Sequence, residues 1–217
     1  MYYTEEPSVF KWARRLRKDM GRESIKTRRK PRADSARNRE RLLEAAKIVF
    51  SAGGAAASLE AVARQAGVGI GTLYRHFPTR EDLFEAVYRR EVEQLAELAD
   101  RLAEECPSVE ALRRWSRANV ELVATKKGML AALSLAVDSS RPVYAYSAER
   151  LGTAIDKLLR QAIDAGEIRR DITGDDYLKA TVALCYIRQD DAWPGTVLRL
   201  IDVFIDGLLV KQISPRG

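Results

Sequence analysis

The sequence has few of the residues that break helices and few of those that build catalytic or metal sites. It contains seven prolines and thirteen glycines in 217 residues, and this scarcity favours an all-α protein. Its two cysteines, Cys106 and Cys185, lie far apart without metal-ligand spacing. We interpret them as buried apolar residues rather than as a redox pair. The only histidine is His76, and no glycine-rich phosphate loop is present, so we expect neither an enzyme nor a cofactor.

Long apolar runs are also lacking. No stretch approaches the roughly 18 apolar residues that a membrane span needs, and no secretion-signal pattern opens the sequence. A reduced compartment suits the unpaired cysteines. These features predict a cytoplasmic protein without a membrane partner.

Positive charge is abundant in one place only. Residues 11–41 carry fourteen Lys or Arg against four Asp or Glu, whereas residues 42–217 carry twenty-three against twenty-five. The net charge of +6 therefore belongs to an arm near the start of the sequence. Such an arm is suited to attraction by phosphates and to insertion into a minor groove.

The segment 58–77 lies after this arm in the sequence and reads as two short helices joined by a tight turn. Ser58 is a good N-cap, and the apolar residues after it recur at the spacing of one helical face. Gly67 supplies the left-handed residue that ends a helix and lets the chain turn. A second short helix follows, with Leu73 facing inward. This is the layout of a helix-turn-helix, whose second helix enters the major groove of DNA.

A longer motif makes this assignment specific. The pattern Ala-Gly-Val-x-x-Gly-Thr-Leu-Tyr-x-His-Phe at residues 66–77, followed by Arg-Glu-Asp-Leu at 80–83, closely resembles the N-terminal domain of TetR-family transcriptional regulators. The resemblance covers about a quarter of the chain, from about Arg37 to about Tyr88. Beyond it, only the length and the order of expected helices resemble the family.

The pattern of caps and apolar residues predicts three parts. Residues 1–31 form a basic, flexible extension, with a break at Pro31; residues 32–80 form the DNA-binding domain; residues 81–217 form a larger helical domain. We expect helices over about 35–52, 79–105, from Ser108 to about 127, over 141–166, from about 173 and from about 193, with a separate apolar segment at 129–137.

Tyr74 and His76 are the strongest candidates for DNA contacts. A phenol hydroxyl and an imidazole N–H can each donate to a phosphate oxygen. A lone histidine on a helix is more often a structural polar residue, but the TetR resemblance implies that His76 contacts the DNA backbone. Gly69 departs from the family pattern, where a hydroxyl residue is common. The remaining candidates for this surface are Thr72, Gly71, Ile70, Gly69, Ser58, Arg75, Arg80 and Arg41.

The larger domain carries the expected effector pocket and dimer interface. The resemblance implies a small-molecule pocket within about residues 90–190, whose effector the sequence does not identify. Aromatic residues with a polar handle suit such a cavity, and the candidates are Trp115, Asn119, Met129, Tyr144 and Tyr146. An apolar seam near the end of the chain predicts a homodimer interface, with Leu178, Val182, Val197, Leu200, Ile201, Phe204 and Leu208 as its residues.

These inferences predict a sequence-specific DNA-binding regulator. We interpret it as a homodimeric repressor that binds a palindromic double-stranded operator and is released by a small-molecule effector. Two alternatives stay open: a DNA-binding or architectural protein that has no effector, and an activator. The apolar helices after Tyr88 argue against purely architectural binding.

Overall fold

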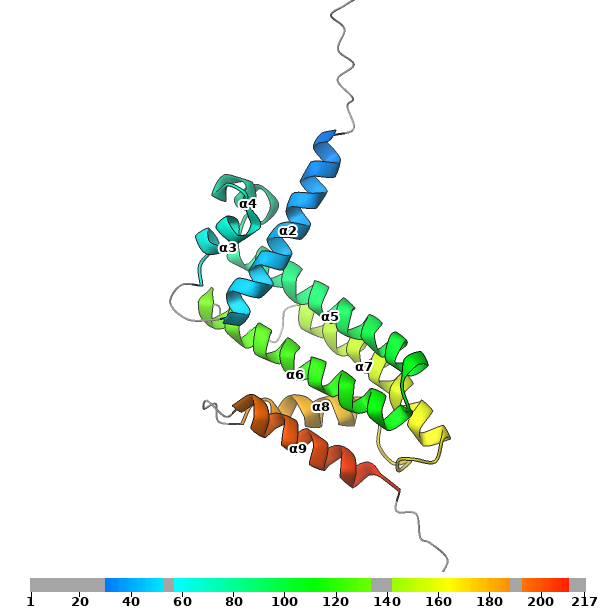
Figure 1. Ribbon diagram of the computed structural model, residues 1–217. Helices are drawn as coiled ribbons and strands as arrows, with labels where there is room; N and C mark the ends of the chain where they lie inside the picture. The colour runs from blue at the N-terminus through cyan, green and yellow to red at the C-terminus, as the bar shows by residue number, and fades with distance from the viewer. Residues whose placement is uncertain (1–29, 53–56, 134–141, 188–192, 211–217) are drawn as a thin grey trace, which may run out of the picture. The chain divides into compact units, whose positions relative to one another are not determined.

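The computed structural model describes residues 30–52, 57–133, 142–187 and 193–210, and the regular structure in these ranges is helical (Figure 1). The only β-type pairing among the described residues is an isolated bridge between Ile168 and Leu209. The all-α prediction is therefore confirmed. The chain divides into two units, one up to Arg37 and one from Asn38 onward. The basic extension at residues 1–29 lies outside the described residues.

The first described helix, α2, spans Lys30–Ala52 and starts five residues earlier than predicted. Pro31 occupies its first turn and does not break it, because a residue there needs no N–H for the helical hydrogen bonds. Residues 33–37 are exposed, with one ion pair of 3.5 Å between Asp34 and Arg37. From Asn38 onward, Leu42, Ala46 and other residues at helical spacing are fully buried in the core.

The two helices of the predicted helix-turn-helix are α3, Leu59–Ala66, and α4, Ile70–His76. We call them the reader helices, and residues 32–80 the reader domain. Ser58 caps α3 by accepting a hydrogen bond of 3.1 Å from the Ala61 N–H. Gly67 ends α3 in the left-handed region at φ 64°, and its own N–H donates to the last carbonyls of that helix. The cap at Ser58 and the turn at Gly67 are the local signals on which the sequence prediction depended. The predictions of α3 and α4 are both confirmed.

Helix α5 spans Arg80–Glu105, close to the predicted range, and begins with a capping box. The Thr79 hydroxyl accepts from the Asp82 N–H, and the Asp82 carboxylate accepts from the Thr79 N–H at 3.0 Å. A second capping box, between Thr173 and Asp176, opens α8, and hydrogen bonding to Thr173 lowers the pKa of Asp176. Both boxes satisfy backbone donors that the first turn of a helix leaves unpaired.

Helix α6 spans Ser108–Ala132 without interruption, so the predicted end near residue 127 and the separate apolar segment are wrong. Gly128 is an interior residue of α6. A Cβ atom there would clash with the backbone oxygen of Phe50, so the glycine allows α6 to approach the end of α2 closely. The sequence also suggests Ser108 as the N-cap of this helix, which is wrong, because Pro107 occupies the N-cap position and no side chain caps the helix.

The remaining helices are α7, Pro142–Asp164, α8, Gly174–Leu184, and α9, Trp193–Leu208. Helices α5, α6 and α7 run side by side, and α8 and α9 pack beside α6 (Figure 1). The inward face of α8 does not carry Leu178 and Val182, the two residues of this helix singled out in the sequence. Tyr177 and Thr181 are fully buried, whereas Leu178 and Val182 are only partly buried. None of the described helices is long and apolar enough to cross a membrane.

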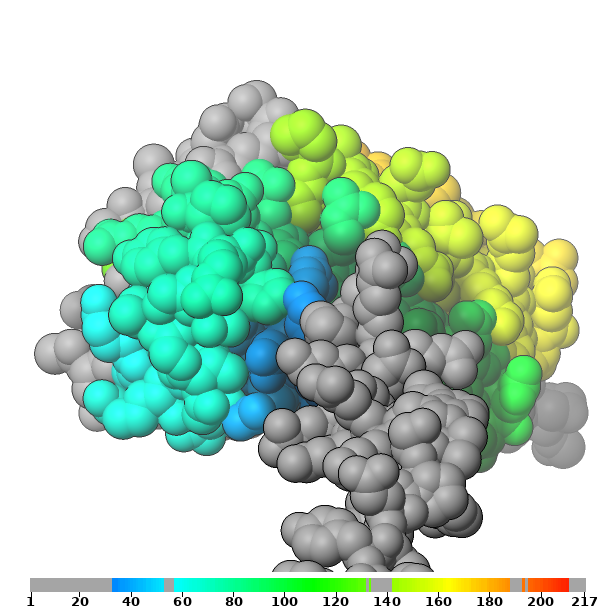
Figure 2. All heavy atoms as spheres, turned by 90° about the horizontal axis from the view of Figure 1, so that it is seen from above, coloured from blue at the N-terminus to red at the C-terminus, as the bar shows by residue number. Residues whose placement is uncertain are grey.

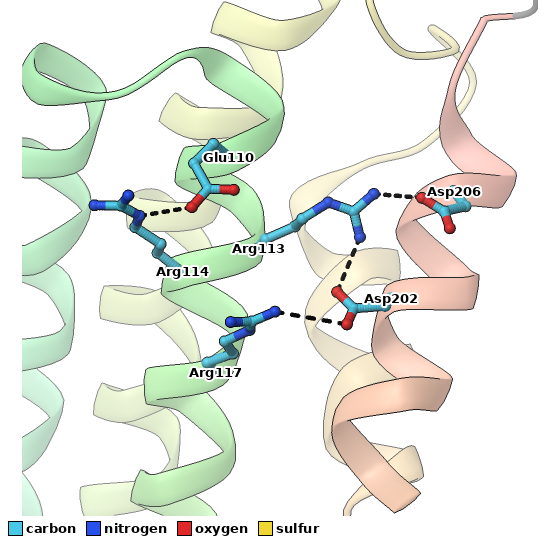
Figure 3. Close-up of polar contacts among 6 residues, drawn as sticks. All are labelled: Glu110, Arg113, Arg114, Arg117, Asp202 and Asp206. Carbon is cyan, nitrogen blue, oxygen red and sulfur yellow. Dashed lines mark hydrogen bonds and ion pairs between the residues drawn. The ribbon is translucent and has the colours of Figure 1, made fainter. Parts of the chain in front are cut away.

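A cluster of charged residues joins α9 to α6 (Figure 3). Arg113 of α6 donates to both Asp202, at 2.9 Å, and Asp206 of α9. Arg117 lies 3.7 Å from the second oxygen of Asp202. Hydrogen bonding to Asp206 raises the pKa of Arg113. A forked guanidinium that bridges two carboxylates fixes orientation better than an isolated surface pair does.

Candidate DNA interface and ligand cavity

The exposed side of α4 carries the residues predicted to meet DNA. Tyr74 is 46% exposed and Ile70 is 38% exposed, whereas Thr72 and His76 are partly buried. Leu73 points into the core and is fully buried. In Figure 2, the cyan to blue-green atoms of α3 and α4 form a continuous part of the surface. The arrangement therefore offers a phenol hydroxyl, a threonine hydroxyl and an apolar side chain on one small helix.

The three glycines of this segment, Gly67, Gly69 and Gly71, differ in whether the fold requires a glycine at their position. Gly67 needs its left-handed conformation, and a Cβ on it would also lie 2.6 Å from Nη2 of Arg41. Gly69 and Gly71 are exposed and face open space, with no atom within 4 Å of an added Cβ. Packing within the chain thus does not require glycine at these two positions.

The predicted arginines differ in how they are held. Arg75 is exposed on α4. Arg41 lies against the Gly67 turn, and Arg80 donates from Nη1 to the Leu133 carbonyl at 3.3 Å. Arg39 is also exposed, and its guanidinium lies 5.3 Å from the centre of the Phe77 ring.

A cavity of about 270 Å³ lies among α5, α6, α7 and α8. Its volume is slightly below the 300–1,000 Å³ typical of sites for drug-sized ligands. Most of its wall is apolar or aromatic, with few polar groups, as is common in small-molecule sites. The lining residues are Tyr88, Asn119, Leu122, Val123, Lys126, Tyr144, Ser147, Ala148, Leu151, Leu178, Val182 and Tyr186.

Of the five residues predicted for an effector pocket, the structure brings Asn119 and Tyr144 to this cavity. Trp115 and Met129 are fully buried core residues, and the indole N–H of Trp115 donates to the Leu95 carbonyl at 3.0 Å. Tyr146 instead lies under Arg89, whose guanidinium is 4.0 Å from the ring centre. The sequence pattern missed Lys126, because a lysine in an amphipathic helix ordinarily faces solvent.

Hydrogen bonds link Tyr88, Ser147 and Tyr144 in the cavity wall, whereas the donors of Lys126 and Asn119 take no part in these bonds. The Tyr88 hydroxyl donates to Ser147 at 3.2 Å, and Ser147 donates to the Tyr144 carbonyl at 2.9 Å. The Lys126 ammonium lies 4.1 Å from the centre of the Tyr144 ring and 5.4 Å from that of Tyr88. Burial lowers the pKa of Lys126. Nδ2 of Asn119 is buried without a hydrogen-bond partner in the described part of the chain.

The same helix that walls the cavity also meets the reader domain. Thr125 and Ser51 share a hydrogen bond of 3.0 Å between their hydroxyls. Gly128 lies against the Phe50 backbone, and the Leu133 carbonyl accepts from Arg80. The second half of α6 thus contacts the end of α2 and the start of α5, within two turns of Lys126.

A larger groove of about 620 Å³ borders α5, α6 and the end of α2, but its chemistry is different. Its lining includes five charged residues, Lys47, Glu91, Glu97, Arg101 and Glu121. Lys47 and Glu91 already pair at 2.6 Å, with Glu91 almost fully buried. The smaller cavity is the better candidate for a small organic ligand, because its wall is mainly apolar and its single charge is that of Lys126.

The apolar seam of α9 divides between the core and the surface. Val197, Ile201 and Leu208 are buried within the chain itself, and Phe204 is partly buried, with its ring centre 5.5 Å from that of Tyr177. The side chains that remain exposed are Leu200, at 38%, and Val203, at 66%. Leu178 and Val182 of α8 are partly buried and line the cavity.

Comparisons with known proteins agree with this architecture. Residues 42–87 match the model of bacterial regulatory proteins of the tetR family, and residues 107–210 match the C-terminal domain of SbtR-like transcriptional regulators. Among solved structures, the TetR transcriptional regulator SCO0520 from Streptomyces coelicolor is 41% identical, with a TM-score of 0.69, over 80% of this chain and 99% of that one. A TetR regulator from Mycobacterium vanbaalenii is 32% identical, with a TM-score of 0.62, over 82% and 99%.

Curated relatives match over shorter stretches, of 66 and 63 residues in two cases. The transcriptional repressor KstR of Mycolicibacterium smegmatis is 41% identical over 66 residues, which is 30% of this chain and 32% of that protein. The chain thus spans about a third of the length of the curated relatives that it matches. The reader helices, the larger helical domain and the full-length structural relatives together show that the chain belongs to the TetR family of DNA-binding transcriptional regulators.

Proposed function

We propose that this regulator is a homodimeric repressor that binds a palindromic operator and leaves it when a small molecule enters the cavity among α5–α8. The observation that carries the proposal is the position of α6, which both walls this cavity and contacts the reader domain. The relative from Mycolicibacterium smegmatis is named a repressor, which favours repression over activation. In this proposal residues 32–80 bind DNA, residues 81–217 bind the effector and dimerise, and residues 1–31 are a basic extension.

The DNA contacts come from the exposed side of α4. Tyr74 and His76 donate to phosphate oxygens and fix the register of the helix, while Thr72 and Ile70 meet base edges or thymine methyls. Gly71 has no side chain, and the open space beside it supports close approach of α4 to the major groove. Phosphate contacts from the basic extension, together with Arg75, add affinity that is independent of sequence.

Dimerisation would use the outer face of α8 and α9. Leu200 and Val203 are exposed apolar residues on a helix that the Arg113 ion pairs hold against α6. A two-fold dimer needs its recognition helices about 34–36 Å apart, or a multiple of that distance, to reach successive major grooves. The position of α9 therefore affects DNA binding through the separation of the two readers.

Effector release follows as a shift between two populations. A ligand that favours one position of α6 also favours one position of the Ser51 hydroxyl and the Phe50 backbone at the end of α2, because these groups are in contact with α6. The extent of release depends on the ratio of ligand affinities for the two reader separations. A ligand that binds both equally leaves the operator occupied.

The test begins with selection of genomic fragments bound by the purified protein, followed by fluorescence-anisotropy titration of one selected fragment. Tyr74→Phe and His76→Ala should each weaken binding by roughly tenfold, because each loses a hydrogen bond to a charged phosphate. Binding to unrelated DNA should weaken by a similar factor, since phosphates are present in every sequence.

Tyr146→Phe is the matched control, because it removes the same hydroxyl from a residue on α7 outside the reader. Unchanged DNA affinity of Tyr74→Phe and His76→Ala would refute the contact assignment. DNA affinity that no compound alters would instead support the effector-independent alternative.

A further inference from the structure

The cavity wall contains two hydrogen-bond donors that the described part of the chain does not satisfy. Asn119 is 1% exposed, and its Nδ2 has no partner there. Lys126 has no carboxylate within ion-pairing distance in the same ranges, although the faces of Tyr88 and Tyr144 lie near its ammonium. Buried polar groups in proteins are usually hydrogen-bonded, so the buried amide of Asn119 indicates a missing partner, and the partly buried Lys126 lies in the same wall.

The surroundings of Lys126 disfavour its charged form when the cavity is empty. Desolvation lowers its pKa, and no acidic neighbour among the described residues offsets that effect. Aromatic faces attract a cation but supply no counter-charge and accept no strong hydrogen bond. Lys127, the next residue, shows the contrast, because its ammonium donates to the Cys185 carbonyl at 2.6 Å and does not line the cavity. An anion in the cavity would give Lys126 the partner that it lacks.

The two donors belong to opposite ends of the same wall. Asn119 and Lys126 are seven residues apart on α6, which is two turns or roughly 10 Å along the helix axis. Leu122 and Val123 lie between them in the wall, and Leu151 of α7 is a further apolar residue of the lining. A complementary ligand is therefore polar at both ends and apolar in the middle.

We propose that the effector is a small organic monocarboxylate whose carboxylate pairs with Lys126 and whose apolar body ends in a hydroxyl or carbonyl oxygen that accepts from Asn119. This inference rests on the proposed role of the cavity. The volume of about 270 Å³ equals that of about nine water molecules at roughly 30 Å³ each. Because bonded atoms pack more closely than liquid water, a molecule of about ten to twelve non-hydrogen atoms fits. The lysine charge also repels amines.

The direct test is isothermal titration of the full chain with matched compounds. One series is 3-(4-hydroxyphenyl)propanoate, its amide and the corresponding amine; a second pairs straight-chain and aromatic carboxylates of similar size with their amides. We expect a carboxylate to bind at least tenfold more tightly than its amide, and the amine not to bind. The hydroxyl-bearing acid should also bind more tightly than 3-phenylpropanoate.

Three variants assign the effect to residues. Lys126→Met should weaken carboxylate binding by roughly ten- to a hundredfold and change amide binding by less than about threefold, because only the acid loses a charge-assisted bond. Asn119→Leu, of similar size, should abolish the preference for the hydroxyl-bearing acid. Lys127→Met is the control, and its carboxylate affinity should stay within about twofold. Circular dichroism of all three checks that helicity is retained.

The inference is overturned if amides bind as tightly as acids, if Lys126→Met binds carboxylates like the parent protein, or if no carboxylate of either series binds. Release of the operator by an uncharged compound would refute the ligand class while leaving the proposed repressor function intact. Conversely, carboxylate binding through Lys126 without any change in DNA affinity would support the site and refute its role as the release switch.

Discussion

The contact between α6 and α2 leads to a quantitative prediction about Gly128. An added Cβ in Gly128→Ala would lie closer than 3.0 Å to the Phe50 carbonyl oxygen, which is backbone and cannot rotate away. Crowding of this kind costs about 1–3 kcal/mol in the free energy of unfolding. Replacing an interior helical glycine by alanine otherwise gains roughly 1 kcal/mol. The clash therefore opposes the gain in helix propensity.

Gly152 provides the matched control, because it is interior to α7 and an added Cβ there meets no atom within 4 Å. Gly152→Ala should raise the free energy of unfolding by about 1 kcal/mol. The difference between the unfolding free energies of the two variants cancels the contribution of helix propensity. Gly128→Ala should therefore be less stable than Gly152→Ala by about 1–3 kcal/mol. That difference corresponds to a change in midpoint temperature of roughly 2–4 °C per kcal/mol for a chain of this size.

Urea denaturation at one fixed protein concentration measures the difference, since the stability of a dimer depends on concentration. Operator affinity of the two variants is then compared by anisotropy. Gly128→Ala should change this affinity because the carbonyl that must move belongs to α2 of the reader domain. Equal stabilisation by both alanines would refute the close contact, and an unchanged operator affinity of Gly128→Ala would refute its role in coupling.

Three further predictions test other parts of the molecule. Leu200→Glu combined with Val203→Glu should give monomers in sedimentation equilibrium without loss of helicity, because both side chains are exposed in the protomer; a persisting dimer would place the interface elsewhere. Deleting residues 1–29 should flatten the plot of log affinity against log salt by about 0.9 for each phosphate that the extension neutralises, and an identical slope would mean that the extension does not bind DNA. Burial raises the pKa of the Cys185 thiol to about 11 and leaves it unexposed, so a thiol reagent at pH 8 should modify one cysteine, the partly exposed Cys106, in the native protein and both in denaturant. Rapid modification of two thiols in the native protein would contradict this burial.

The reader domain illustrates how far local signals reach. Ser58, Gly67 and Thr79 act within three or four residues of themselves, as caps or as a left-handed turn, so the sequence pattern alone located α3, α4 and the start of α5. Gly128 shows where such reasoning fails. A glycine after two lysines indicates a helix end, yet this one is kept for close approach to another helix, which no local pattern encodes.

The larger domain was harder to interpret because its faces are selected by packing. Periodicity predicted the apolar stripe of α9 but not which part the chain itself would bury, and Val197 and Ile201 proved to be core residues. Tyr177 was missed as a core residue because its hydroxyl is satisfied by Ser116, 61 residues away in the sequence, at 2.6 Å. A buried hydroxyl needs a partner, and only the folded chain supplies it.

The sequence by itself determined the helical class, the helix-turn-helix and the family resemblance, because capping, turn formation and helical periodicity depend on residues a few positions apart. Tertiary structure decided where the cavity lies and what it presents. Lys126 reads as an ordinary helix residue, and Asn119 as one of five pocket candidates, until α5, α7 and α8 enclose them with α6. Burial removes water from their polar atoms, and that loss, which depends on distant segments, is what makes the two side chains informative about a ligand.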